Sequence, residues 1–489
     1  MAKNIMLQGT MSNVGKSFLT AALCRILRQD GYSVAPFKSQ NMALNSFITP
    51  DGYEIGRAQA LQAEAAGIEP SALMNPILLK PTTDVGSQVI VNGRVRGNMR
   101  AADYFRHKKE LIPDIMSAYN VLASKYDIIV IEGAGSPVEL NLKADDIVNM
   151  GLAELVKSPV LLVGDIDRGG VFAQLIGTLE LLEKSERDKV KGLVVNKFRG
   201  DISLFRDGID ILEKRSHKTV AGVVPYISCD IEDEDSLSEK LTVKNADGLI
   251  DIAVIRLPKI SNFTDFDVFN QYEGVSLRYV TRADELGQPD MIIIPGTKST
   301  ISDMKWIEEN GIADTIKSCF KTDIPIFGIC GGYQIMGRKI TDPSGSECGG
   351  QVDGLGLLDC YTVFGADKRQ TQTSGRFNNV QGFFSCLSGA EFYGYEVHMG
   401  ITEDIQAELT TCGGSSNGSA VGCYVHGIFD SADVSGRLIN ALYKRKGLTY
   451  GGNSVDRRQY RQRQLDLIAD NARKNLDMEL IYRIIKEGV

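Results

Sequence analysis

GTMSNVGKS, at residues 9–17, is the stretch of sequence that decides the fold of the first half of the chain. The strand-like run NIMLQ precedes it, and apolar residues with helical spacing follow it over 18–29. A strand, a glycine-rich turn ending in Gly-Lys-Ser and a helix, in that order, point backbone N–H groups and a helix N-terminus at phosphate oxygens. The stretch therefore predicts a nucleotide-binding loop in a parallel α/β fold.

The loop departs from the common pattern G-x-x-x-x-G-K-[ST], because Thr10 stands at the first glycine position and Gly9 lies one residue earlier. This variant resembles the loop of dethiobiotin synthetase-like enzymes. In such a loop Lys16 reaches the β and γ phosphates of ATP, and the Ser17 hydroxyl binds Mg²⁺. A chance Gly-Lys-Ser after a strand is the alternative. The predicted ATP-binding residues are Thr10, Asn13, Val14, Gly15, Lys16, Ser17 and Asn196.

Polar residues at the ends of later strands extend this predicted site. Glu132 ends a buried strand, where a charge is costly unless it meets a cation or donors, so we expect it to face Mg²⁺ together with Ser17. Asp165 and Asp167 end the next strand, at the edge where open α/β sheets bind ligands, and both a metal-linked and a helix-capping role fit them. Asn196 ends a further strand, where related P-loop enzymes recognise adenine; a turn-forming role is the alternative.

Outward from the loop, strand-like and helical runs alternate along most of the chain, which predicts βαβ units and parallel sheets. The first series covers 1–235. The acidic run 229–240 is interpreted as a linker, or else as a solvated loop within one domain. A second α/β series covers 250–446, and a polar, helical appendage follows at 447–489. The expected fold class is α/β, with two doubly wound domains.

The run IFGICGGYQIMG, at residues 326–337, predicts a second site, in the second domain. An apolar strand, a sharp Gly-Cys-Gly-Gly turn and a helix form a nucleophile elbow with Cys330 at its apex. A helix N-terminus favours the anionic thiolate, which is the nucleophilic form. Cys330 is therefore the expected nucleophile.

The nucleophile needs a base, and a histidine distant in sequence is expected to supply it. His426 follows a strand at the edge where the elbow projects and is the first choice, with His398 as the second. Gly296 and Gly331 are expected to donate backbone N–H groups to the oxyanion that forms during attack. For Gly296 the alternative is a helix-starting turn.

Composition excludes several classes of protein. At about 150 residues per domain, 489 residues predict two or three compact units. A formal net charge of −8 argues against nucleic-acid and anionic-membrane partners. The apolar runs are strand-sized, well short of the roughly 20 residues of a membrane span, and no signal peptide is evident, so we expect a cytoplasmic protein. Nine cysteines without CxxC pairs predict reduced thiols and no structural zinc.

Both sites together, with four longer segments, resemble the cobyric acid synthase family, the glutamine-dependent amidases of cobalamin biosynthesis. The segments are FKSQNMALNS at 37–46, EIGRAQALQAEAAG at 54–67, MNPILLKPTTDVGSQVIVNG at 74–93 and GYEVHMG at 394–400. The resemblance covers nearly the whole chain. It implies a P-loop NTPase-like domain that binds ATP, Mg²⁺ and corrinoid, followed by a class I glutamine amidotransferase domain.

By the same resemblance, the enzyme amidates the b, d, e and g propionates of adenosylcobyrinic acid a,c-diamide with ammonia from glutamine, one ATP for each. Its partners would be these small molecules alone. The residues implied to bind the polyanionic corrinoid are Lys38, Gln40, Asn41 and Asn45. Two alternatives remain: cobyrinic acid a,c-diamide synthase, which shares the two-domain plan, and a partitioning-type P-loop scaffold ATPase, which needs neither Cys330 nor a corrin.

The second site departs from the wider class I amidotransferases in one respect. Their histidine is followed two residues later by an acid, whereas here that position is Ile428. A Cys330/His426 dyad is therefore assigned, as in the cobyric and cobyrinic acid amidases. The acid that would orient His426 stays open, with Asp430 as one candidate.

Overall fold

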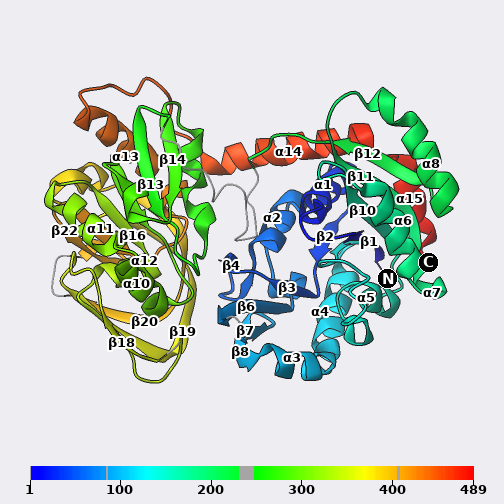
Figure 1. Cartoon of the computed structure of the whole chain (residues 1–489), viewed down its shortest axis with the longest axis horizontal. Helices are drawn as coiled ribbons and strands as arrows, with labels where there is room; N and C mark the ends of the chain where they lie inside the picture. Colours follow the sequence, from blue (N-terminus) through cyan, green and yellow to red (C-terminus); the bar gives the residue numbers. More distant parts are fainter. Residues whose placement is uncertain (1, 84–85, 231–246, 348, 405–407) are drawn as a thin grey trace.

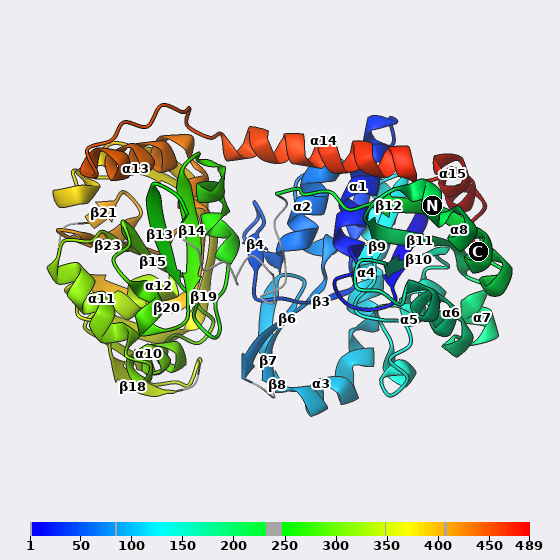
Figure 2. The same cartoon turned by 45° about the horizontal axis from the view of Figure 1, so that its top comes forward.

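Two α/β bodies, bridged along one side by a long helix, make up the molecule (Figure 1, Figure 2). The computed structural model describes residues 2–83, 86–230, 247–347, 349–404 and 408–489. Each body contains a largely parallel sheet flanked by helices, so the expected class of two doubly wound α/β domains is confirmed. Most of the acidic run 229–240 lies outside the described residues.

Six parallel strands form the sheet of the first domain, in the order β12-β11-β10-β1-β9-β2. Their bounds are β1 Lys3–Gly9, β2 Val34–Phe37, β9 Ile128–Glu132, β10 Val160–Asp165, β11 Val190–Phe198 and β12 Val220–Pro225. Side chains of β1 alternate between two apolar cores, with Ile5 and Leu7 in one and Met6 in the other. Both faces of the sheet are therefore covered, as apolar parallel strands require.

The helices of this domain follow the strands as the sequence predicts. Their bounds are α1 Lys16–Gln29, α2 Arg57–Ala66, α3 Ala101–His107, α4 Ile112–Lys125, α5 Met150–Leu155, α6 Val171–Leu181, α7 Lys184–Arg187 and α8 Arg206–Ser216. Two small sheets lie on the side that faces the second domain (Figure 1). They consist of β3 Gln40–Met42, β6 Ile77–Thr83, β7 Gly86–Val91 and β8 Arg94–Arg100, and of β4 Ser46–Ile48 with β5 Glu54–Gly56.

The second domain has a seven-stranded sheet in the order β14-β13-β15-β16-β23-β22-β21, parallel from β14 to β23. The strands are β13 Ile250–Ile255, β14 Val275–Val280, β15 Met291–Ile294, β16 Ile326–Ile329, β21 Glu408–Thr410, β22 Gly413–Asn417 and β23 Ala420–Cys423. The helices are α9 Ala283–Leu286, α10 Thr300–Glu309, α11 Ile312–Lys321, α12 Gly331–Met336 and α13 Ala432–Arg445, with the 3₁₀ segments η6 Phe263–Gln271 and η8 Ile428–Asp430.

A second sheet, in the order β18-β17-β19-β20, extends this domain toward the first. Its strands are β17 Lys339–Asp342, β18 Gly350–Asp353, β19 Cys360–Arg376 and β20 Glu391–Asp404. The long antiparallel pair β19 and β20 contacts β4 of the first domain. Periodicity in the sequence did not predict this pair, which brings residues of the second domain to the domain boundary.

The two C-terminal helices, α14 Arg457–Asn475 and α15 Met478–Glu487, are not the peripheral appendage that the sequence suggested. Ile468, Ala469 and Ile481 are fully buried in the same apolar core as α1 and β1. Arg25 of α1 also pairs with Asp466, with Nε 2.8 Å from Oδ1. The chain thus returns from the second domain to complete the core of the first.

No helix in the part of the chain that the structure describes combines the length and the apolar character needed to span a bilayer.

Two candidate active sites

The nucleotide-binding loop connects β1 to α1 as predicted. Gly15 has φ 94°, in the left-handed region that glycine adopts without strain, and a Cβ there would collide with the Asn196 side chain. Asn196 Nδ2 donates to the Val14 carbonyl at 2.8 Å. Asn196 thus braces the loop here, and adenine recognition by this residue stays a prediction.

Lys16 lies at the start of α1, almost fully buried. Its Nζ donates to the Met11 carbonyl at 3.0 Å and to the Gly135 carbonyl at 3.1 Å. Burial lowers the pKa of Lys16 to about 8, and the nearby Glu132 limits the decrease. The ammonium therefore sits between two loops at the carboxyl edge of the sheet, where it could meet phosphate oxygens.

Glu132 is the buried acid at the end of β9, with an exposure of 1%. It accepts hydrogen bonds from Ser17 Oγ at 2.8 Å, Lys38 Nζ at 2.9 Å and Gln62 Nε2 at 2.5 Å. Burial alone would raise the pKa of Glu132, but Lys38 and the other donors outweigh it and hold the pKa below its usual range. The carboxylate and the Ser17 hydroxyl are oxygen donors of the kind that Mg²⁺ prefers, so the pair fits that ion.

The remaining polar residues of this edge have protein partners. Asp165 Oδ2 lies 2.9 Å from Lys197 Nζ, and Asp167 Oδ1 accepts from Arg199 Nε at 2.6 Å. Neither acid caps α6, which begins after Gly170 without a side-chain cap. Among the described residues no cluster of three or more His, Cys, Asp or Glu side chains forms a candidate metal site.

The other predicted ATP- and corrinoid-binding residues have protein partners or are buried. Thr10 Oγ1 donates to Gln174 Oε1 at 3.1 Å, and the Asn13 carbonyl accepts from Lys197 Nζ at 2.6 Å. Asn41 Nδ2 donates to Gln59 Oε1 at 2.9 Å, and Gln40 Oε1 accepts from the Tyr104 hydroxyl. Asn45 is fully buried beside β4. Their roles toward ligands stay predictions.

Cys330 forms the elbow between β16 and α12. Its φ is 50°, an uncommon value for a residue with a side chain, and its N–H donates to the Cys423 carbonyl at 2.9 Å. The thiol lies 3.6 Å from the Val397 carbonyl. A Cβ at Gly332 would collide with the Ile294 carbonyl, so only glycine permits this close approach of α12 to β15.

His426 lies beside Cys330 and is 1% exposed. Burial lowers its pKa, but Asp265 and Cys330, which both interact with the ring, outweigh burial and raise the pKa of His426 to about 10. The ring also stacks on Tyr395, with centroids 5.4 Å apart. His398, the second choice, instead bonds to the Gly400 carbonyl at 2.7 Å and stacks on Tyr424.

The two glycines predicted to form the oxyanion hole lie near Cys330 and His426. Gly296 follows β15, and a Cβ there would lie 2.9 Å from His426 Cε1. Gly331 opens α12, and a Cβ there would lie 2.9 Å from the backbone nitrogen of Thr297. Gly296 thus approaches the ring of His426, and Gly331 follows Cys330 directly in the chain; their role as oxyanion donors stays a prediction.

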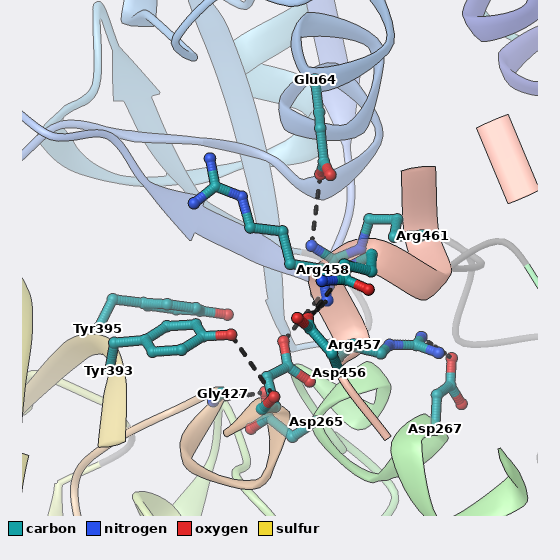
Figure 3. A network of polar contacts seen from close by, with 12 residues as sticks. Glu64, Asp265, Asp267, Tyr393, Tyr395, Gly427, Asp456, Arg457, Arg458 and Arg461 are labelled. Atoms are coloured by element: carbon teal, nitrogen blue, oxygen red, sulfur yellow. Dashed lines mark hydrogen bonds and ion pairs between the residues drawn. The ribbon is translucent and has the colours of Figure 1, made fainter. Parts of the chain in front are cut away.

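Sequence reasoning missed Asp265, the acid that contacts His426. Asp265 Oδ2 lies 2.7 Å from His426 Nδ1. Its Oδ1 accepts from the Gly427 N–H at 3.1 Å, and Figure 3 labels both of these residues. Asp430, the candidate named above, instead lies 3.3 Å from Arg461 of α14. One signal could have found Asp265: it is an acid in the aromatic run NFTDFDVF that follows the buried strand β13.

A segment of the first domain reaches this second site. The Ser46 N–H donates to Asn262 Oδ1 at 2.9 Å, and the Ser46 carbonyl accepts from the Tyr395 hydroxyl at 3.0 Å. Asn262 lies three residues before Asp265, and Tyr395 pairs through its backbone with His426. The neighbours of the catalytic candidates are therefore held by the other domain.

A buried ionic cluster joins the domains next to Ser46. Glu54 of β5 accepts from Ser46 Oγ at 2.7 Å and lies 2.8 Å from Lys80 Nζ. It also pairs with Lys368 of β19 and accepts from Gln370 Nε2 at 2.9 Å. Burial would raise the pKa of Glu54, but the two lysines outweigh it and lower the pKa. Partners on both sides thus keep this buried charge ionised.

Two family models match the chain. Residues 5–238 match the CobQ/CobB/MinD/ParA nucleotide binding domain, and residues 251–434 match the CobB/CobQ-like glutamine amidotransferase domain.

Curated relatives match over essentially their whole length. A cobyric acid synthase of Lachnoclostridium phytofermentans is 55% identical, with 100% of both chains covered. One of Ruminiclostridium cellulolyticum is 53% identical over 100% of this chain and 98% of its own, and one of Alkaliphilus metalliredigens is 50% identical over 98% and 99%.

Proposed function

The chain belongs to the cobyric acid synthase family, and we propose that it amidates the b, d, e and g propionates of adenosylcobyrinic acid a,c-diamide, using ATP and glutamine. A nucleotide-binding domain and a glutamine amidotransferase domain on one chain supply the two half-reactions. The single observation that carries the proposal is the segment 38–46. Its first residue, Lys38, pairs with Glu132, and its last, Ser46, accepts from the hydroxyl of Tyr395, whose ring stacks on His426.

The first half-reaction activates a carboxylate. A propionate oxygen attacks the γ phosphorus of ATP, which gives an acyl phosphate and ADP and turns a poor leaving group into phosphate. Lys16 would hold the β and γ phosphates in place. Ser17 and Glu132 would hold Mg²⁺, which when bound neutralises phosphate charge. Lys38, Gln40, Asn41 and Asn45 would face the corrinoid.

The second half-reaction releases ammonia from glutamine. The Cys330 thiolate attacks the side-chain amide, and backbone N–H groups of Gly296 and Gly331 would stabilise the oxyanion. His426 gives its proton to the departing nitrogen, so that ammonia leaves and a thioester remains. Water then hydrolyses the thioester to glutamate. The ammonia attacks the acyl phosphate, which forms the amide and expels phosphate.

The test is to incubate the purified protein with ATP, Mg²⁺, glutamine and adenosylcobyrinic acid a,c-diamide and to follow the corrinoid by mass spectrometry. We expect four successive conversions of acid to amide. Conversion of cobyrinic acid only as far as its diamide would instead identify the sister activity. No change in either corrinoid would contradict both assignments.

A further inference from the structure

Asp265 is the carboxylate in direct contact with the ring of His426. Ionised carboxylate oxygens only accept hydrogen bonds, so Nδ1 must carry the proton of the 2.7 Å contact. Nε2 is then the nitrogen left to face the Cys330 thiol. The second oxygen of Asp265 accepts from the Gly427 N–H at 3.1 Å, which fixes the carboxylate on the loop that carries the histidine (Figure 3).

We propose that Asp265 is the positioning carboxylate of the glutaminase site, supplied by η6 in place of the acid that the wider class carries two residues after its histidine. The inference rests on the proposed function, because it assigns a role within glutamine hydrolysis. Asp265 acts through His426, by holding one tautomer and one ring orientation and by stabilising the imidazolium.

Neighbouring acids are turned to other partners. Asp267, two residues further along η6 and also buried, lies 3.8 Å from Arg457 of α14. Asp430 lies 3.3 Å from Arg461. Glu396, on β20, has Oε2 2.8 Å from Arg369 Nε and 3.4 Å from His398 Nε2. Asp265 thus differs from these three acids in its contact with His426.

The titratable groups that face His426 come from three elements: Asp265 from η6, Cys330 from the elbow after β16, and Tyr395 from β20. Burial alone would lower the pKa of His426, whereas the charges of Asp265 and Cys330 raise it. Replacing Asp265 with a neutral residue removes one of the two raising charges. The imidazolium then loses its proton at lower pH, and the thiolate beside it loses a stabilising cation.

The test compares Asp265→Asn with Asp265→Glu and with Asp430→Asn, a matched loss of charge on the histidine loop. We expect Asp265→Asn to lower kcat for glutamine hydrolysis by about 10²- to 10⁴-fold. The limb of the pH profile that reports His426 should move to lower pH. Iodoacetamide should also alkylate Cys330 more slowly at neutral pH, which mass spectrometry of the Cys330 peptide can follow. Ammonia-dependent amidation should be unchanged in all three variants.

Asp265→Glu should have a kcat for glutamine hydrolysis, and a limb of the pH profile, between those of Asp265→Asn and of the wild type. Asp430→Asn should change neither the kcat nor the position of that limb. Wild-type kcat with an unmoved limb in Asp265→Asn would overturn the inference, as would an equal loss of ammonia-dependent amidation, which indicates a structural role. Failure of the proposed function looks different, because the wild-type protein itself would then leave the corrinoid unamidated with glutamine and with ammonia alike.

Discussion

The two candidate active sites occupy the same place in their sheets, the carboxyl ends of parallel strands, but they are assembled differently. At the nucleotide site, the donors to Glu132 all belong to the first domain. At the glutaminase site, His426 meets Asp265 from 161 positions away, and its neighbour Tyr395 hydrogen-bonds Ser46 of the other domain. The first site is self-contained, whereas the second is completed across the domain boundary. Its geometry should therefore depend on the synthetase domain.

The largest expected effect is that of Cys330→Ala, which should abolish the use of glutamine and leave the use of ammonia intact. Cys330→Ala removes the proposed nucleophile, so glutamine-dependent amidation should fall by about 10⁴-fold or more. Ammonia-dependent amidation should persist, because the self-contained nucleotide site is intact. Both rates can be measured on the same corrinoid by mass spectrometry.

Cys423→Ala is the matched control for that variant. Cys423 is the thiol on the neighbouring strand β23, where burial raises the pKa of the thiol to about 12 and keeps it protonated. Both nitrogen sources should still support amidation in this variant. Loss of the ammonia-dependent rate in a folded Cys330→Ala enzyme would contradict the division between the sites.

Lys16→Ala should impair the nucleotide site and leave the glutaminase site active, with a smaller loss of amidation than Cys330→Ala causes with glutamine. Carboxylate activation precedes amide formation, so both glutamine- and ammonia-dependent amidation should fall, by about 10²- to 10³-fold for the loss of one phosphate-stabilising cation. Glutamine hydrolysis measured without ATP should be retained, because Cys330 and His426 lie in the other domain. Undiminished amidation with ammonia would remove Lys16 from the ATP site.

The same contrast explains what the sequence could predict. Gly15, Lys16 and Ser17 are adjacent in the chain, so their pattern alone predicts a strand, a loop and a helix, and the structure has all three. That Glu132 meets hydrogen-bond donors could be predicted, because a charge at the end of an apolar strand requires partners, whereas its role toward Mg²⁺ stays a prediction. The elbow at Cys330 could also be predicted, because the strand, turn and helix that form it are consecutive in the chain.

Contacts between distant segments could not be predicted. Asp265 meets His426 only because η6 and the loop after β23 approach each other in the folded domain, and no spacing in the chain encodes that approach. The C-terminal helices looked polar because α14 presents charged residues, such as Arg457 and Arg461, to partners in the domains that it bridges. Their buried face became evident only from the shared core with α1.

The smallest expected effect tests the domain boundary itself. Tyr395→Phe keeps the ring that stacks on His426 and removes only the hydroxyl that donates to Ser46. One hydrogen bond has a net worth of about 0.5–1.5 kcal/mol, which corresponds to a change of about 2- to 10-fold. We expect the glutamine-dependent rate to fall by that factor and the ammonia-dependent rate to stay unchanged.

Tyr393→Phe is the control for that variant, because Tyr393 (labelled in Figure 3) lies on the same strand and its hydroxyl donates to the Asp430 carbonyl within the second domain. Tyr393→Phe should leave the ratio of the two rates at its wild-type value, since it breaks no contact with the first domain. If both variants changed that ratio equally, the effect would belong to β20 in general. A fall confined to Tyr395→Phe would show that the glutaminase geometry depends on Ser46, the residue through which the segment beginning at Lys38 reaches from one active site to the other.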